Sequence, residues 1–450
     1  MAVHGKGRAM KTHLANAAYG ILDYGAYPIG MLAVAPVVLH NLGIAQYGIW
    51  TVATAAVSTG GIIASGFGDA NIQHVSSRLG AGNQQIVLRA VRSMMGINLV
   101  LGLALATMGW LLSPLAASHV ASADANLRSS CLWSLRIASA TMAVRAVESV
   151  CISTQRAFER YGSAVRISII VRLLSLAAAA GIALASRGVI AIMATTALLM
   201  LAGLFLQLSK LKLLLAADTL TPAFDRDAMR ALFAFGAFSW LQAVAGLVFS
   251  QVDRLILGVS LGAAAVTSYA LCAQMAQPIY GFAASGLHFL FPYLSKRNAE
   301  LNTASLRTPV LTAFVCNALF VGITTAVLLM LGDRIVKLWV GAAIAQAAAP
   351  ILATVIWSSA LLGLNVTATY ALLALGRVRT VTWLNLAGGA VMLLMMLYLT
   401  PILGILGIAI ARLSYALFPL FLYIPLLRCL NRKPALTRTV SLLAPIGDRQ

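Results

Sequence analysis

One pattern of leucine, glycine, small residues and a closing aromatic occurs twice in the chain, as LGIAQYGIW at residues 42–50 and LGAAAVTSY at residues 261–269. The offset is 219 residues, and a Ser-Gly pair recurs further on, at residues 65–66 and 285–286, at an offset of 220. Each copy links two long apolar runs, so the common offset indicates an internal repeat. Six apolar runs separate the copies, an even number, so the two halves run parallel.

The composition requires a membrane. Of the 450 residues 60% are apolar and 10% are charged, and the mean hydropathy is +0.90. A soluble domain carries about 25% charged residues, so a soluble enzyme, a disordered protein and a disulfide-stapled module are all excluded. Twelve apolar runs are long enough to cross a bilayer. The sequence therefore predicts an all-α polytopic membrane protein, with about twelve transmembrane helices in two parallel six-helix lobes around a central cleft.

The chain divides near its midpoint. Lys210 and Lys212 stand beside three leucines, and Thr221 followed by Pro222 is typical of a new helix start. This segment predicts an amphipathic connector on the inner membrane surface. The predicted organisation is a first lobe at 1–208, the connector at 209–231, a second lobe at 232–430 and a cytoplasmic tail at 431–450.

The basic residues predict the orientation. Lys and Arg exceed Asp and Glu by 20, and they stand between the apolar runs rather than in a basic-aromatic patch, so nucleic acid is not an expected partner. With the N-terminus inside, the inner segments carry 23 basic residues and the outer segments carry 5. Cytoplasmic loops are enriched in Lys and Arg. Both termini are therefore expected in the cytoplasm, with anionic lipids as partners.

Catalysis is not expected. The chain has no phosphate-binding loop, no GxSxG nucleophile motif, no cluster among its six histidines and no long outer loop. We therefore predict no enzymatic activity, no catalytic residue, no cofactor and no metal site.

Ionisable residues inside the predicted spans are the candidates for function, because such groups are costly in hydrocarbon and usually face a cavity or a partner. Four are arginines and two are acids, an excess of two positive charges. Guanidinium groups bind phosphate and carboxylate bidentately, whereas a cation exporter is expected to favour acids. The arginines, as contacts for an anionic headgroup, are Arg136, Arg145, Arg172 and Arg412, and the acids, as coupling or proton sites, are Asp23 and Glu148.

Structural interpretations stand beside these functional ones. Glu148 follows Arg145 by one helical turn, so the two predict either a self-neutralising pair or a substrate contact. Arg136 and Arg172 lie close to the ends of their spans, where a long side chain can reach the membrane surface.

Two further positions differ in their surroundings. Arg412 has no acid near it in the sequence. Asp253 and Arg254 lie at a span end and predict an interface anchor or a local ion pair.

Several stretches together resemble the polysaccharide transporter family, the lipid-linked oligosaccharide flippases within the multidrug/oligosaccharidyl-lipid/polysaccharide exporter superfamily. They are apolar patterns that touch both halves of the chain. They read LGIAQYGIWTV (42–52), RALFAFGAF (230–238), VDRLILGVSLGAAAVTSYAL (252–271), FLFPYLSKR (289–297) and PILGILGIAIARL (401–413).

The resemblance implies a V-shaped pair of lobes that alternate access across the bacterial inner membrane. The implied cargo is an undecaprenyl-pyrophosphate-linked oligosaccharide, moved to the outer leaflet for exopolysaccharide or O-antigen assembly, with polymerase or export machinery as possible partners. The family tends to have a cationic lumen, which Arg145 and Arg412 could match. A multidrug or cation antiporter of the same superfamily, resting on Asp23, is the alternative. A membrane scaffold or an integral glycan enzyme is the third interpretation of its function.

Overall fold

The computed structural model is all-helical over the residues that it describes. These are 2–65, 68, 71–72, 75–76, 84–122, 124–158, 160–224, 240–241, 246, 250–287, 290–291, 293–294 and 306–431, with side chains from residue 27 onward except at 64, 65, 84, 161, 163 and 164.

Nine helices in these ranges are long and apolar enough to cross a membrane. About 20 apolar residues at 1.5 Å each match the roughly 30 Å hydrocarbon core. The chain is therefore a multi-pass membrane protein. One predicted span, 232–252, lies mostly outside the described residues, so the count of twelve stays a prediction. The order is α1 (Ala2–Ser65), α3 (Gln84–Val120), α4 (Ala125–Ala157), α5 (Tyr161–Leu184), α6 (Gly188–Leu214), α8 (Val252–Gly286), α10 (Arg307–Val340), α11 (Ala342–Ala374), α12 (Val378–Leu403), α13 (Ile405–Leu417), the 3-10 helix η2 (Phe418–Leu422) and α14 (Tyr423–Leu430).

The repeated motif marks the same backbone break in both halves. Gly43 breaks α1 at φ 82°, ψ 170°, and Gly262 breaks α8 at φ 82°, ψ 176°. A side chain is disfavoured at this positive φ, which is why glycine stands there. The two glycines are 219 residues apart, the offset of the sequence motif.

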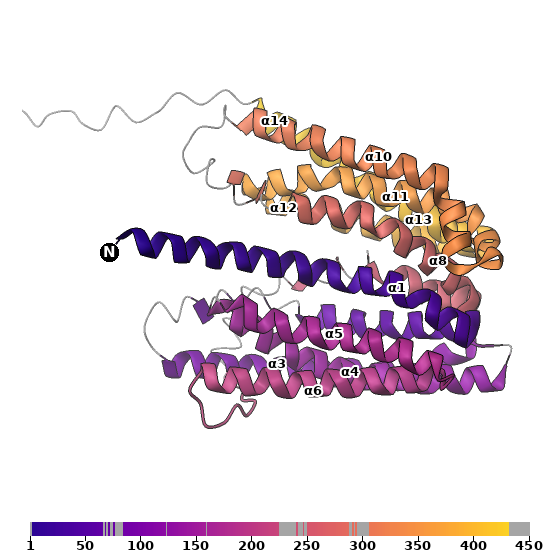
Figure 1. Cartoon of the computed structure of the whole chain (residues 1–450), viewed down its shortest axis with the longest axis horizontal. Coiled ribbons are helices and arrows are strands. Elements are labelled where there is room, and N and C mark those ends of the chain that lie inside the picture. The colour runs from indigo at the N-terminus through magenta and orange to yellow at the C-terminus, as the bar shows by residue number, and fades with distance from the viewer. Residues whose placement is uncertain are drawn as a thin grey trace, which may run out of the picture.

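The helices of each half of the chain lie together. We call residues 2–224 the first half and residues 250–431 the second half. In Figure 1, α3, α4, α5 and α6 lie together on one side of α1, and α10, α11, α12 and α13 lie on the other. The two halves meet where α1 packs against α8.

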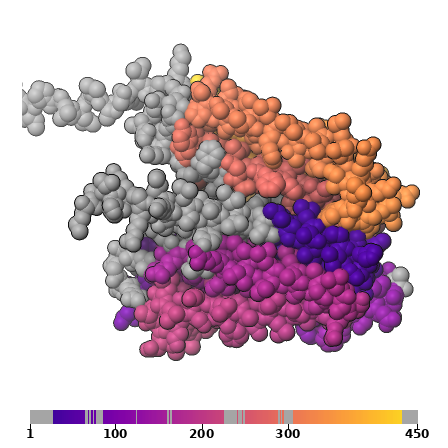
Figure 2. All heavy atoms as spheres, in the orientation of Figure 1, coloured from indigo at the N-terminus to yellow at the C-terminus, as the bar shows by residue number. Residues whose placement is uncertain are grey.

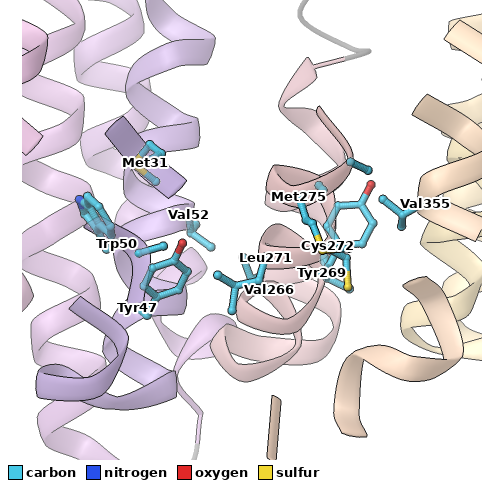
Figure 3. Close-up of a cluster of buried hydrophobic side chains, with 14 of the residues drawn as sticks. Met31, Tyr47, Trp50, Val52, Val266, Tyr269, Leu271, Cys272, Met275 and Val355 are labelled. Atoms are coloured by element: carbon cyan, nitrogen blue, oxygen red, sulfur yellow. The ribbon is translucent and has the colours of Figure 1, made fainter. Parts of the chain in front are cut away.

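The buried core repeats this division. One cluster draws residues from both halves, including Tyr47, Val52, Val266 and Leu271, which face one another in Figure 3. A second cluster contains buried residues of the first half alone, from 75 to 217, and a third contains those of the second half alone, from 290 to 426. The halves therefore share one core and otherwise have separate ones.

Hydrogen bonds join the halves around the two glycine turns. Thr267 Oγ1 donates to the carbonyl oxygen of Ile44 at 2.7 Å, and Trp339 Nε1 donates to that of Leu32 at 2.8 Å. Figure 2 shows the described atoms of α1 wedged between the helices of the two halves in this region. Both bonds lie within about a dozen residues of Gly43 in α1, so they tie the halves together at this end.

The described part of the predicted connector begins as helix. α6 continues to Leu214, and residues 215–224 then leave it. Arg92 Nε of α3 donates to the Thr221 carbonyl oxygen at 2.8 Å, so this stretch is held against the first half. Residues 225–231 lie outside the described residues, and the lobe boundaries stay a prediction.

Candidate substrate site

A tyrosine of α1 lies among three arginines. Arg145 of α4, Arg172 of α5 and Arg254 of α8 are each close enough to the Tyr27 hydroxyl to interact with it electrostatically. Tyr27 is 36% exposed, so its side chain is partly open to its surroundings. We call these four residues the arginine–tyrosine cluster. Three positive charges from both halves of the chain therefore lie within electrostatic range of one hydroxyl.

Arg145 is paired within its own helix. Its Nη1 donates to Glu148 Oε2 at 2.7 Å, and the Glu148 side chain is 4% exposed. Ser168 Oγ of α5 lies 3.5 Å from the other carboxylate oxygen, a long contact. The Arg145 side chain remains 27% exposed. A guanidinium carries five N–H donors, so one bond to Glu148 leaves donors for an external anion.

Arg172 stands eleven residues, or about 16 Å, into α5, which starts at Tyr161. The part of this helix that is apolar enough to cross a membrane starts at Val165, seven residues before Arg172. The structure brings it together with Arg145, as part of the same cluster.

Arg254 is the cluster member that the sequence did not single out. It interacts electrostatically with Tyr47 and Tyr269 as well as with Tyr27. Its Nε is buried and has no hydrogen-bond partner among the described residues. The expectation of an interface anchor at a span end is wrong for its neighbour Asp253, which is 1% exposed and packed inside the second half.

Arg412 forms a buried ion pair. Its Nη1 on α13 contacts Asp253 Oδ2 on α8, and the Tyr269 hydroxyl donates to the same oxygen at 2.7 Å. The sequence showed no acid near Arg412, because its partner is 159 residues away along the chain. Arg412 is therefore the counter-charge of Asp253, and it is not a member of the arginine–tyrosine cluster.

Arg136 lies apart from the cluster. It stands nine residues before Arg145 on α4, about 13 Å along the helix. Its guanidinium carbon is 4.8 Å from the centre of the Trp110 ring and 5.2 Å from that of Trp133. Both indoles are exposed on the flank of α3 and α4, so Arg136 makes cation–π contacts there.

Of the two predicted coupling acids, the structure describes the side chain of one. Glu148 is the buried partner of Arg145 described above. Asp23 lies outside the residues whose side chains are described. Within the described ranges, no three His, Cys, Asp or Glu side chains come together as they would around a metal ion.

The charges around the cluster sum to a positive site. Among the described side chains, four arginines (Arg145, Arg172, Arg254 and Arg412) stand against two acids, Glu148 and Asp253, which leaves two positive charges in excess. Such an excess at membrane depth favours an anion, and phosphate matches the guanidinium fork.

The fold is similar to those of solved membrane transporters. The structure superposes on a lipid II flippase MurJ in an inward closed conformation with a TM-score of 0.74, at 12% identity, covering 92% of this chain and 89% of that one. An inward-facing multidrug resistance MATE family transporter gives 0.71 at 15% identity, covering 91% and 95%. An outward-facing MATE family transporter gives 0.53 at 16% identity, covering 90% and 95%.

The sequence places the chain within a family. The profile of the family described as "Polysaccharide biosynthesis protein" matches residues 42–349. The chain belongs to this family. No curated protein sequence matches the chain significantly.

Proposed function

We propose that this protein is a flippase that carries a lipid-linked oligosaccharide of the undecaprenyl-pyrophosphate type across the bacterial inner membrane. The observation that carries the proposal is the convergence of Arg145, Arg172 and Arg254 on Tyr27. In this proposal the three guanidinium groups hold the pyrophosphate, and the product supplies exopolysaccharide or O-antigen assembly. Polymerase or export proteins are its proposed partners, and the protein itself performs no bond chemistry.

Transport of this cargo needs a polar route. Polar groups lose their hydrogen bonds to water when they enter hydrocarbon, and an unpaired charge costs far more. A water-lined cleft between the halves replaces those bonds for the sugars and the pyrophosphate, while the lipid tail stays in the bilayer. An inside-negative potential favours outward movement of the anion by about 2.3 kcal/mol per charge per 100 mV.

The proposed architecture is twelve spans in two parallel six-helix lobes around that cleft. The matching breaks at Gly43 and Gly262 support it, because each divides a long helix into two segments at equivalent places. The lobes are 1–208 and 232–430, with both termini in the cytoplasm. The shared core around the glycine turns then closes the outer end, and cargo enters from the inner leaflet.

Glu148 is the proposed coupling acid, together with Asp23. Protonation of Glu148 breaks its ion pair with Arg145 and alters the charge offered to the pyrophosphate. Bound pyrophosphate competes with Glu148 for the same guanidinium, so cargo release and ion-pair formation are linked.

A cation antiporter is the second candidate, because MATE transporters share the fold. The buried acids that the structure describes, Glu148 and Asp253, are both paired with arginines. A cation would have to displace a guanidinium from either one. The antiporter therefore rests on Asp23, and the flippase is favoured.

The test is a deletion strain. We expect a lipid-linked oligosaccharide to accumulate on the cytoplasmic face of its inner membrane, and the wild-type gene to clear it. A variant with Arg145, Arg172 and Arg254 all changed to Gln should fail to clear it, whereas Arg187→Gln, at an exposed turn, should succeed. Unchanged lipids and surface polysaccharide, together with raised drug susceptibility, would instead support the antiporter.

A further inference from the structure

A neutral polar cavity lies in the second half, away from the arginine–tyrosine cluster. It has a volume of about 120 Å³ and is bounded by α8, α11, α12, α13 and η2. A water molecule in liquid occupies about 30 Å³, so the space exceeds that of a single water. The residues used in the argument are Tyr280, Tyr370 and Tyr415, with Asn365 and Asn385.

The lining selects against ions. Among the described residues that bound the cavity there is no Asp, Glu, His, Lys or Arg. Tyrosine hydroxyls and asparagine amides both donate and accept hydrogen bonds, and tyrosine rings present flat apolar faces. A sugar ring offers the matching surface, with hydroxyl groups around its edge and C–H groups on its faces.

Asn365 provides an unused acceptor. It is 3% exposed, and its Nδ2 donates to the carbonyl oxygens of Leu361 at 2.8 Å and Ala416 at 3.2 Å. These two bonds fix the orientation of the amide. Its Oδ1 is buried without a hydrogen-bond partner in the described structure. A buried acceptor left unpaired is costly, and a hydroxyl donor from a ligand would satisfy it.

The cavity adjoins the charged site. Tyr415 is close enough to Arg412 for an electrostatic interaction, and Arg412 pairs with Asp253, the residue before Arg254. The opposite side of the cavity is more open, since Tyr280 is 39% exposed. Tyr415 and Arg412 therefore link the lining of the cavity to the Asp253–Arg412 pair, next in sequence to Arg254.

We infer that this cavity is a subsite for one uncharged sugar ring of the transported lipid-linked oligosaccharide. The inference rests on the proposed function. The arginine–tyrosine cluster binds the pyrophosphate that all such lipids share, and the cavity adds affinity only when sugar is attached.

The experiment measures the binding of two lipids to the purified full chain in nanodiscs. One lipid is undecaprenyl pyrophosphate, and the other is the lipid-linked oligosaccharide extracted from the deletion strain. Asn365→Ala and Tyr415→Phe each remove a hydrogen-bonding group from the cavity. The matched controls are Asn317→Ala and Tyr423→Phe, which remove the same groups outside it, where they bond to the carbonyl oxygens of Gly363 and Leu364.

We expect the wild-type protein to bind the glycosylated lipid about tenfold more tightly than the bare one. Each cavity variant should reduce that ratio by roughly threefold or more, as expected for a lost hydrogen bond, without weakening binding of the bare lipid. The controls should keep the wild-type ratio.

Two results would overturn the inference while leaving the proposed function intact. One is equal binding of the two lipids by the wild-type protein. The other is a ratio that neither cavity variant changes. If the wild-type protein bound neither lipid, the proposed function would fail, and the subsite with it.

Discussion

Tyr47 and Gln274 hydrogen-bond to each other across the two halves of the chain. The Gln274 amide donates to the Tyr47 hydroxyl at 3.0 Å, and the hydroxyl lies 3.3 Å from the amide oxygen. The two residues are 227 positions apart, and both are buried. The pair lies in the core that the halves share, so it joins them where α1 meets α8.

We predict that Tyr47→Phe loosens this junction. The substitution leaves the buried Gln274 amide unpaired, at a cost of about 1–3 kcal/mol. That cost applies only while the halves are packed together, so the population in which they separate there should rise about fivefold or more. The reporter is Val266→Cys in a protein whose five native cysteines are replaced by alanine. Val266 is fully buried in the shared core, so separation of the halves should speed maleimide labelling of the introduced thiol.

Tyr423→Phe is the control for this measurement. It removes a tyrosine hydroxyl that bonds within the second half, to the carbonyl oxygen of Leu364 at 2.6 Å. Equal labelling rates in Tyr47→Phe and the control would show that the Tyr47–Gln274 pair does not hold the halves together.

Gly48 permits a close approach of the two halves. A Cβ at this position would lie 1.9 Å from the carbonyl oxygen of Ala263, far inside van der Waals contact. We therefore predict that Gly48→Ala lowers the thermal unfolding midpoint and exposes the Val266 cysteine reporter. Gly181→Ala meets nothing within 4 Å and should be neutral or stabilising, by up to about 1 kcal/mol. Similar behaviour of the two variants would contradict the packing described.

The Asp253–Arg412 pair should behave as a unit. Removal of one partner leaves the other charge buried and costs about 3–5 kcal/mol, whereas removal of both costs much less. We expect Asp253→Asn and Arg412→Gln each to destabilise the protein strongly. The double variant should recover much of that loss in a thermal unfolding cycle. Additive single effects would show that the two charges are not coupled.

Arg136 serves as a negative test of the substrate site. Its cation–π contacts with Trp110 and Trp133 contribute about 0.5–1 kcal/mol each at an exposed position. We predict that Arg136→Gln clears the accumulated lipid in the deletion strain as well as the wild-type gene does, while Arg145→Gln is impaired. Loss of clearance in Arg136→Gln, with normal amounts of protein in the membrane, would place Arg136 on the transport route.

The helical membrane fold could be predicted because its determinants are local. Apolar runs specify spans, and the offset of 219 residues indicated equivalent positions in the two halves, where the structure has breaks at Gly43 and Gly262. The Arg145–Glu148 pair was also predictable, because residues three apart share a helix face.

The rest of the site depends on helix packing. Asp253 and Arg412 are 159 residues apart, and no sequence spacing indicates that α8 and α13 bring them together. Arg254 was missed because it lay at a predicted span end, although an arginine beside an acid in an apolar run was a usable signal. The neutral cavity likewise collects residues from four α-helices and η2.

The most direct test measures flipping in proteoliposomes. The cargo is the lipid-linked oligosaccharide from the deletion strain, carrying a nitrobenzoxadiazole label that external dithionite quenches. We predict that wild-type protein exposes inner-leaflet cargo to dithionite well above the rate in protein-free vesicles. The variant with Arg145, Arg172 and Arg254 changed to Gln should not exceed the protein-free rate. A wild-type rate equal to that of protein-free vesicles, or full activity in the triple variant, would contradict transport through the arginine–tyrosine cluster.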